Sequence, residues 1–110
     1  MNDKDRIRLH HLIESCLAIG EFIQQRNRKD LDTDRMLFSA ITRELEIIGE
    51  AVNALSDEFT SKYPHIPWQD MVGMRNRLIH AYFNINADIV WKTVTTAIPE
   101  LAKSIQTILG

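Results

Sequence analysis

Residues 74–82 bring a guanidinium, an amide, an imidazole and a phenol together in the short run Met-Arg-Asn-Arg-Leu-Ile-His-Ala-Tyr. Phosphoryl chemistry without a metal requires groups of these kinds. An arginine presents a planar fork of donors to phosphate oxygens, and a histidine gives or takes a proton near neutral pH. The spacing of Arg75, His80 and Tyr82 therefore indicates a site that acts on a phosphate group.

Apolar residues with helical periodicity predict four amphipathic helices that would position this segment. The first covers about residues 5–26, and the second runs from Asp32 or Thr33, plausible N-caps, to about Leu55. Residues 56–66 show no clear period and read as a loop. In the second helix a further apolar row, which predicts contact with more than one neighbour, consists of Met36, Ala40, Ile47, Ala51 and Ala54.

The third predicted helix begins near Pro67 and runs through the whole segment of interest, until residues 84–86 break it and cap a fourth. Pro99 lies on the polar face of the fourth helix, so we expect a kink there rather than a break. The predicted fold is therefore all-α, a four-helix up-down bundle with a kinked last helix, in a single domain over residues 1–110.

A helical wheel separates the candidate residues. Arg75 and Tyr82 fall within the apolar arc of the third helix, whereas His80 lies about 140° from Arg75 and close to Asn76. The amide of Asn76 could then orient the imidazole. Arg75 and His80 meet only if the helix distorts, if Arg75 bends across its surface, or if a second subunit completes the site; we favour a second subunit.

The segment, with its flanks, resembles the signature of the HEPN superfamily, and specifically the HepT branch of toxins that are partnered by minimal nucleotidyltransferase antitoxins. The resemblance covers nearly the whole chain. Besides Arg75, Asn76, His80 and Tyr82 it rests on the run Arg-Glu-Leu-Glu-Ile-Ile-Gly-Glu-Ala at residues 43–51, on Ile66-Pro67-Trp68, and on Trp91, Pro99 and Leu101.

This resemblance implies a homodimeric, metal-independent endoribonuclease toxin of a type VII toxin–antitoxin system. In such enzymes the RNA 2′-hydroxyl attacks the adjacent phosphate, and two copies of the motif face one cleft. His80 would transfer protons, and Arg75 would stabilise the phosphorane. Asn76 would orient a neighbouring group or hydrogen-bond to it, and Arg77 would contact an outer phosphate. Tyr82 matches the residue that the cognate nucleotidyltransferase adenylylates. The resemblance implies no metal and no cofactor.

Composition sets independent bounds on the function. With 110 residues, a net charge of -2 and a pI near 6.0, the chain is not a globally basic nucleic-acid binder, so RNA affinity must come from a local cluster. The single Cys16 cannot form an intramolecular disulfide, and the sequence shows no membrane span or signal-peptide core. We therefore expect a cytoplasmic protein without a membrane partner.

Simpler interpretations exist for each candidate. Arg75 could pair structurally with Glu46 or Glu50, and Arg43, Glu46 and Glu50 fit pairing along one helix better than a catalytic carboxylate pair. His10, His11 and Glu14 lack the spacing of known metal motifs. The alternative function is a non-catalytic helical module that binds nucleotide or partners a nucleotidyltransferase.

Overall fold

The chain is helical throughout, as predicted for the all-α class, and no strand occurs in the part of the chain that the structure describes. This computed structural model describes residues 1–81 and 83–110 in full, and of Tyr82 it describes the backbone alone. Among the described residues, no helix has both the length and the apolar composition needed to cross a membrane. The elements are α1 (Asp3–Phe22), α2 (Asp30–Thr33), α3 (Arg35–Asn53), α4 (Asp57–Ser61), α5 (Trp68–His80), the 3-10 helix η1 (Tyr82–Asn84), α6 (Ala87–Lys92), the π-helical segment η2 (Thr93–Ala97) and α7 (Ile98–Leu109).

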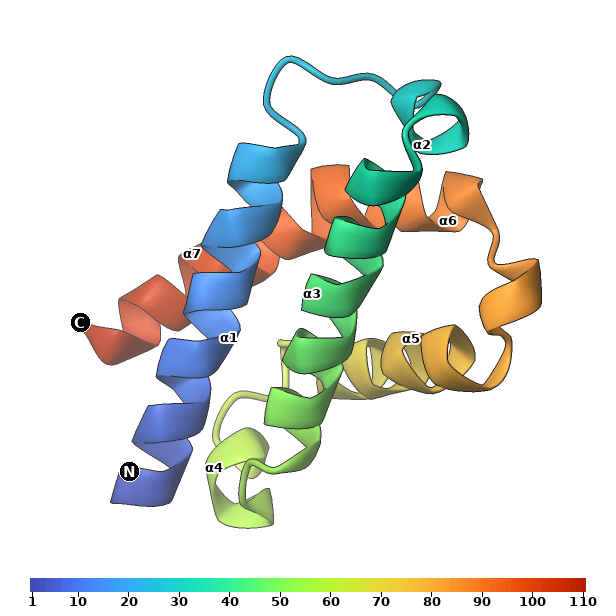
Figure 1. The fold of residues 1–110 in the computed structure, drawn as a ribbon. Coiled ribbons are helices and arrows are strands. Elements are labelled where there is room, and N and C mark those ends of the chain that lie inside the picture. The colour runs from blue at the N-terminus through green and yellow to red at the C-terminus, as the bar shows by residue number, and fades with distance from the viewer.

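Helices α1 and α3 run antiparallel and form the centre of the molecule (Figure 1). Helix α5 packs against α3, and α7 packs against α1. Figure 1 shows that α5 and the run from α6 to α7 cross behind this central pair instead of following its direction. The predicted up-down bundle of four aligned helices is therefore not confirmed, although four long helical segments do build the core.

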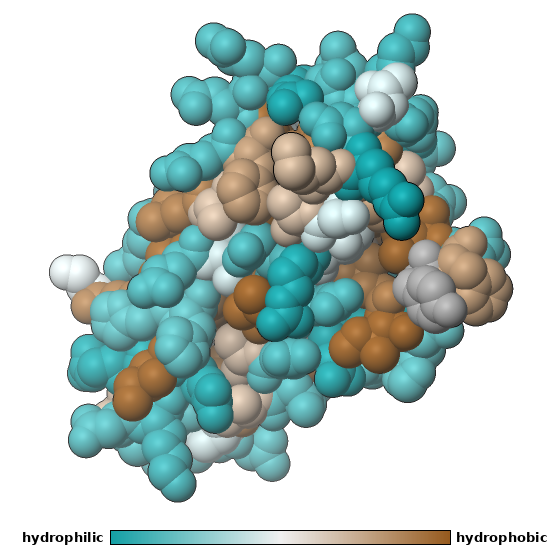
Figure 2. Space-filling view, viewed as in Figure 1, coloured by the Kyte–Doolittle hydropathy of each residue, from teal (hydrophilic) through white to brown (hydrophobic). Residues whose placement is uncertain are grey.

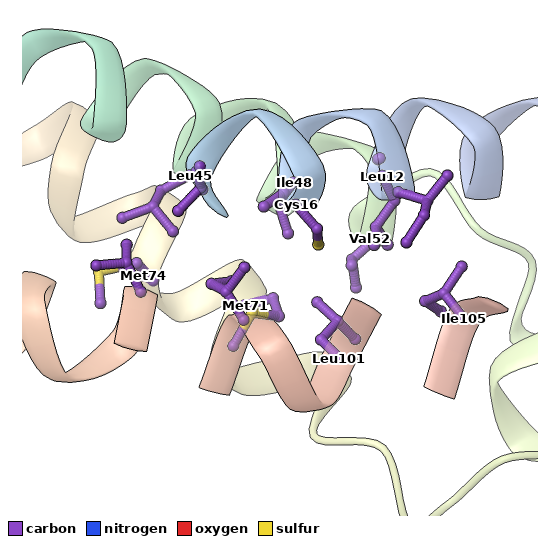
Figure 3. Packing of buried hydrophobic residues seen from close by; sticks show 14 of the residues in the cluster. Leu12, Cys16, Leu45, Ile48, Val52, Met71, Met74, Leu101 and Ile105 are labelled. Atoms are coloured by element: carbon purple, nitrogen blue, oxygen red, sulfur yellow. The ribbon is translucent and has the colours of Figure 1, made fainter. Parts of the chain in front are cut away.

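The core lies where these segments meet, and Figure 3 shows side chains from α1, α3, α5 and α7 converging there. The predicted main stripes are confirmed, because Leu12, Leu45, Met71 and Leu101 are each at most 5 % exposed. The second row on α3 is only partly correct. Ala51 is buried, but Met36 in the first turn of α3 is 80 % exposed and Ala54 is also exposed.

Two helix boundaries differ from the sequence prediction. Helix α1 ends at Phe22, before the predicted end near Arg26, and Gln25 adopts a positive φ of 61° in the turn that follows. Helix α3 is capped by Asp34, whose side chain accepts a hydrogen bond from the backbone N–H of Leu37 at 3.1 Å. Neither Asp32 nor Thr33 is the cap, because a short helix that the period did not reveal, α2, takes up both residues.

The predicted loop at residues 56–66 contains the short helix α4, which the search for a period missed because it buries only Phe59. Ser56 caps α4 and ties it to α1. The buried Asp5 carboxylate accepts hydrogen bonds from the Ser56 backbone N–H at 2.9 Å and from its hydroxyl at 2.6 Å. This pair joins the start of α1 to the turn after α3.

Pro99 does not interrupt the last helical run, which continues from α6 through η2 to α7. The segment just before the proline is π-helical, over Thr93–Ala97, and Pro99 lies in the first turn of α7, where an N–H is not needed. The hydroxyls of Thr93 and Thr95 bond back to the helix, with Thr95 Oγ1 donating to the Trp91 carbonyl at 2.7 Å. A wider turn thus accommodates the proline.

Candidate functional site

Helix α5 carries most of the predicted site residues and is anchored by its apolar face. Trp68 starts the helix from a buried position, where its indole N–H donates to the Tyr63 carbonyl at 3.1 Å. Met71, Met74 and Leu78 continue that buried face at spacings of three and four residues. The helix is therefore held firmly enough to give its polar residues definite directions.

Arg75 lies where α5 crosses α3, and Gly49 makes this close crossing possible. A Cβ atom placed on Gly49 would stand 2.2 Å from the Arg75 Cβ and 2.9 Å from the Met71 carbonyl oxygen, which is too close for any other residue. In the sequence, Gly49 appears only as part of the run at residues 43–51, and no role is predicted for it. A glycine inside a long helix costs about 0.5–1 kcal/mol relative to alanine, and that cost was the available signal of a packing requirement.

The guanidinium of Arg75 reaches the surface beside α3 with part of its hydrogen-bonding capacity unused. Its Nη1 donates to the Asn76 side-chain oxygen at 3.1 Å, and its Nη2 lies 3.8 Å from a carboxylate oxygen of Glu50. Its Nε is buried and has no hydrogen-bond partner among the described residues. The Glu50 pair is long and half exposed, so it is weak. The Arg75 fork can therefore bind an additional anion.

The contacts of the neighbouring carboxylates decide between the structural alternatives for Arg75. Glu50 is the carboxylate nearest to its guanidinium, whereas Glu46 pairs with Arg43 at 3.5 Å. The predicted pairing along α3 thus holds for Arg43 and Glu46 but does not include Glu50.

His80 is the last residue of α5 and is exposed. The predicted contact with Asn76 is not present, because the Asn76 amide oxygen instead accepts from Arg75, and the hydrogen bonds of the described residues include none between Asn76 and His80. The imidazole is consequently open to solvent and to any molecule that docks on this end of the helix.

One chain does not bring Arg75 and His80 together in the described residues. Helix α5 has no irregular turn between them, so they remain about 140° apart around its axis. The Arg75 guanidinium lies between α3 and Asn76, since its Nη2 is 3.8 Å from Glu50 and its Nη1 donates to the Asn76 side-chain oxygen. Within the described part of one chain, neither a distortion of α5 nor a contact between Arg75 and His80 is present.

Tyr82 cannot be placed beside Arg75 by the helical wheel. The prediction that the third helix continues through Tyr82 is wrong, since α5 ends at His80 and Ala81, with φ -126° and ψ 37°, turns the chain into η1. No glycine or proline marks this end in the sequence. The side chain of Tyr82 lies outside the described residues, so the predicted modification site has no described surroundings.

Arg77 is exposed on α5. It lines a cavity of about 120 Å³ between the end of α5 and the start of α6. Sequence reasoning missed this cavity, because it forms only when Asn84 and Asn86 fold back toward α5.

Other candidate nucleophiles and ligands are not assembled into a site. Burial raises the pKa of the Cys16 thiol to about 12, so it stays protonated and unreactive at neutral pH. His10, His11 and Glu14 form no cluster, and no group of three or more potential metal ligands of the His, Cys, Asp or Glu type occurs in the described part of the chain.

Comparison with known proteins places these features in a family. The family model described as Ribonuclease HepT-like matches residues 12–108. A candidate RNase of Caldanaerobacter subterraneus subsp. tengcongensis is 42% identical over 92% of this chain and 90% of its own length. A probable ribonuclease HepT of Thermococcus cleftensis is 40% identical over 84% of each chain. No solved structure gives a significant match. The chain therefore belongs to the HepT-like ribonuclease family.

Proposed function

We propose that the protein is a metal-independent endoribonuclease in which Arg75 and His80 act on the scissile phosphate. The observation that carries this proposal is the Arg75 guanidinium, which is held at the α3 crossing, is about one-third exposed and has only a long 3.8 Å pair with Glu50. A phosphate could replace this weak pair with charge-assisted hydrogen bonds to the exposed guanidinium nitrogens. Membership of a ribonuclease family supports RNA as the source of that phosphate.

The proposed reaction needs a base, an acid and a stabilising cation. A base takes the proton of the 2′-hydroxyl, the 2′-oxygen bonds to the phosphorus, and the bond to the 5′-oxygen breaks as an acid protonates it. The products are a cyclic phosphate and a free 5′-hydroxyl. The exposed imidazole of His80 is suited to the proton transfers, and the Arg75 fork is suited to the charge that accumulates on the phosphorane oxygens.

A homodimer is part of the proposal because one chain leaves the two groups on different sides of α5. Two copies related by a twofold axis would place Arg75 of one chain near His80 of the other, and would do so twice. Asn76 holds the guanidinium at 3.1 Å and so acts as a positioning group, while Arg77 remains available for an outer phosphate.

The biological role that we propose is that of a toxin whose activity is blocked by adenylylation of Tyr82. The partner would be a minimal nucleotidyltransferase, and the site of action the cytoplasm. The added adenylate carries a negative phosphate close in sequence to His80, and it would compete with RNA for the same cations. Intact mass after incubation with the transferase and ATP tests this role, since Tyr82→Phe should remain unmodified; equal modification of both proteins would exclude Tyr82.

The catalytic proposal is tested by cleavage of total cellular RNA with the purified, unmodified protein. Arg75→Ala and His80→Ala should each lower the rate by roughly 100-fold or more, the usual scale for such groups, while RNA affinity falls less. EDTA should not change the rate. A protein that cleaves no RNA, or that requires added magnesium, would favour the alternative of a non-catalytic interaction module.

A further inference from the structure

Besides the exposed His80, the end of α5 has a second feature that could bind a ligand, the cavity beside Arg77. It opens between the last turn of α5 and the first turn of α6, and Ala81, which directly follows His80, is part of its lining. Met74, Leu78 and Val90 make its inner wall and are buried. The cavity thus joins an apolar interior to the surface near the end of α5, whose last residue is His80.

Two polar side chains at the mouth of this cavity have no hydrogen-bond partner among the described residues. Arg77 and Asn84 are both exposed, and neither side chain has a hydrogen bond or an ion pair among the described residues. Asn86, the third polar lining residue, is already used, because its side-chain oxygen caps α6 by accepting from the Asp88 and Ile89 N–H groups. The mouth therefore offers one cation and one amide that can both donate and accept.

The dimensions of the cavity select a small flat group. Its volume of about 120 Å³ is close to the ~150 Å³ of an engineered protein cavity that holds a benzene molecule. A helix or a peptide strand would not fit. Figure 2 shows apolar surface near the right-hand edge of the molecule. Ile89, a residue of α6 that lines the cavity, is 43 % exposed.

An unpaired base of single-stranded RNA has the properties that this cavity requires. Such bases swing out of the strand, bury their faces against apolar or aromatic side chains, and are read along their edges by amide groups. The phosphate attached to the same nucleotide would lie outside the cavity, within reach of a guanidinium at its mouth. The ring of a pyrimidine matches the volume better than the two fused rings of a purine.

We propose that this cavity is a base-recognition subsite, in which one pyrimidine of the RNA substrate is bound with its edge on Asn84 and its phosphate on Arg77. The inference rests on the proposed function and names its substrate class as single-stranded RNA with a pyrimidine beside the cleaved bond. Ala81 of the cavity lining directly follows His80 in the chain, which is why we assign the bound base to the nucleotide beside the cleaved bond.

The proposal is tested by binding rather than by cleavage, in a His80→Ala background that leaves the RNA intact. Fluorescence anisotropy would compare labelled oligouridylate and oligoadenylate of six nucleotides at one salt concentration. We expect tighter binding of oligouridylate. Asn84→Ala should reduce that preference roughly two- to tenfold, the scale of one neutral hydrogen bond. Arg77→Ala should weaken both oligonucleotides alike, because a phosphate contact carries no base information.

Two further variants make the result decisive. Ile89→Trp fills the cavity from α6 and should abolish the preference, and its fold is checked by circular dichroism. Asn53→Ala, an exposed asparagine on the last turn of α3 outside this cavity, should leave binding unchanged. Absent binding, equal binding of the two oligonucleotides, or a preference that neither Asn84→Ala nor Ile89→Trp alters would overturn the proposal.

The two proposals fail in different ways. If the unmodified protein cleaves no RNA but shows the base preference, the endoribonuclease assignment fails, and the cavity stands as a pyrimidine-binding site without a cleaved bond beside it. If the protein cleaves RNA and the cavity variants bind both oligonucleotides as their parent does, the subsite fails and the endoribonuclease assignment stands.

Discussion

At the scale of single residues, the contact between Gly49 and Arg75 is the point where packing and proposed chemistry meet. The glycine lets α3 approach α5 so closely that the stem of Arg75 lies against the α3 backbone. Any side chain at position 49 would push against both Arg75 and the Met71 carbonyl. Gly49 is therefore a structural requirement for the position of a proposed catalytic group.

Gly49→Ala should destabilise the fold by about 1–3 kcal/mol, the usual cost of overpacking a core contact, and should also displace Arg75. Urea denaturation measures the first effect and RNA cleavage the second. Gly73→Ala is the matched control in α5, because nothing lies within 4 Å of the added Cβ and alanine favours the helix by up to ~1 kcal/mol. Equal stability of the two variants would contradict the close crossing.

The Asp5–Ser56 pair makes stability depend on pH. Burial by itself raises the pKa of the Asp5 carboxyl, but the hydrogen bonds from the Ser56 hydroxyl and N–H outweigh this and hold that pKa below its ordinary value. A carboxyl with a lowered pKa in the folded state stabilises the protein above its unfolded pKa, and this contribution disappears as the pH falls through the folded value.

Asp5→Asn should lower the free energy of unfolding at pH 7 by about 1–3 kcal/mol, since the new amide cannot accept both bonds from Ser56. The variant should lose less stability relative to the wild type when the same urea titration is repeated at pH 3. That pH lies below the ordinary pKa of an aspartate, so protonation of the unfolded wild-type chain removes part of the benefit of the charged pair. Glu14→Gln, at an exposed position on α1, serves as the control. A deficit that is as large at pH 3 as at pH 7 would speak against the charged pair.

At the scale of elements, the turn between α5 and α6 decides where the proposed active surface ends. The carbonyl of Ala81 accepts from the Asn84 N–H at 2.9 Å, which closes η1. Asn86 then starts α6 by capping it at 2.9 Å and 3.2 Å. In the first turn of α6, Asp88 pairs with Arg28 at 2.6 Å and so ties this helix to the connection before α2.

Asn86→Ala should cost about 1 kcal/mol, because two N–H groups at the start of α6 lose their acceptor. Asn86→Asp keeps the acceptor and adds a negative charge at a helix N-terminus, so it should be at least as stable as the wild type. Thermal unfolding of both variants checks this prediction. If both substitutions lowered stability equally, the capping assignment would be wrong.

At the scale of the whole molecule, a regular α5 within one chain makes a shared active site the simplest arrangement. Mixing subunits of Arg75→Ala and His80→Ala tests it. In a twofold dimer with two shared sites, random exchange makes half of the dimers mixed, and each mixed dimer has one intact site of two. About a quarter of the wild-type activity should therefore return. Sedimentation gives the oligomeric state in the same sample. A strictly monomeric protein, or a mixture as inactive as its components, would rule out the shared site.

The sequence by itself determined the helical class, the main buried stripes, the family and the residue types of the candidate site. It did so because helical periodicity and the signature around Arg75 and His80 are local properties of the chain. The predicted helix boundaries next to the short helices α2 and α4 were less accurate than the buried stripes. Each of these short helices buries one residue, which leaves no period to detect.

Only the tertiary structure decided what the candidate residues contact. The crossing at Gly49 and the bond between Asp5 and Ser56 join parts of the chain that are distant in sequence, and the cavity at Arg77 forms where α6 folds back on α5. The end of α5 before Tyr82 likewise follows from the turn that must lead into α6. Such features arise from the close packing of several elements against one another, and no property of one helix specifies how closely a second will approach it.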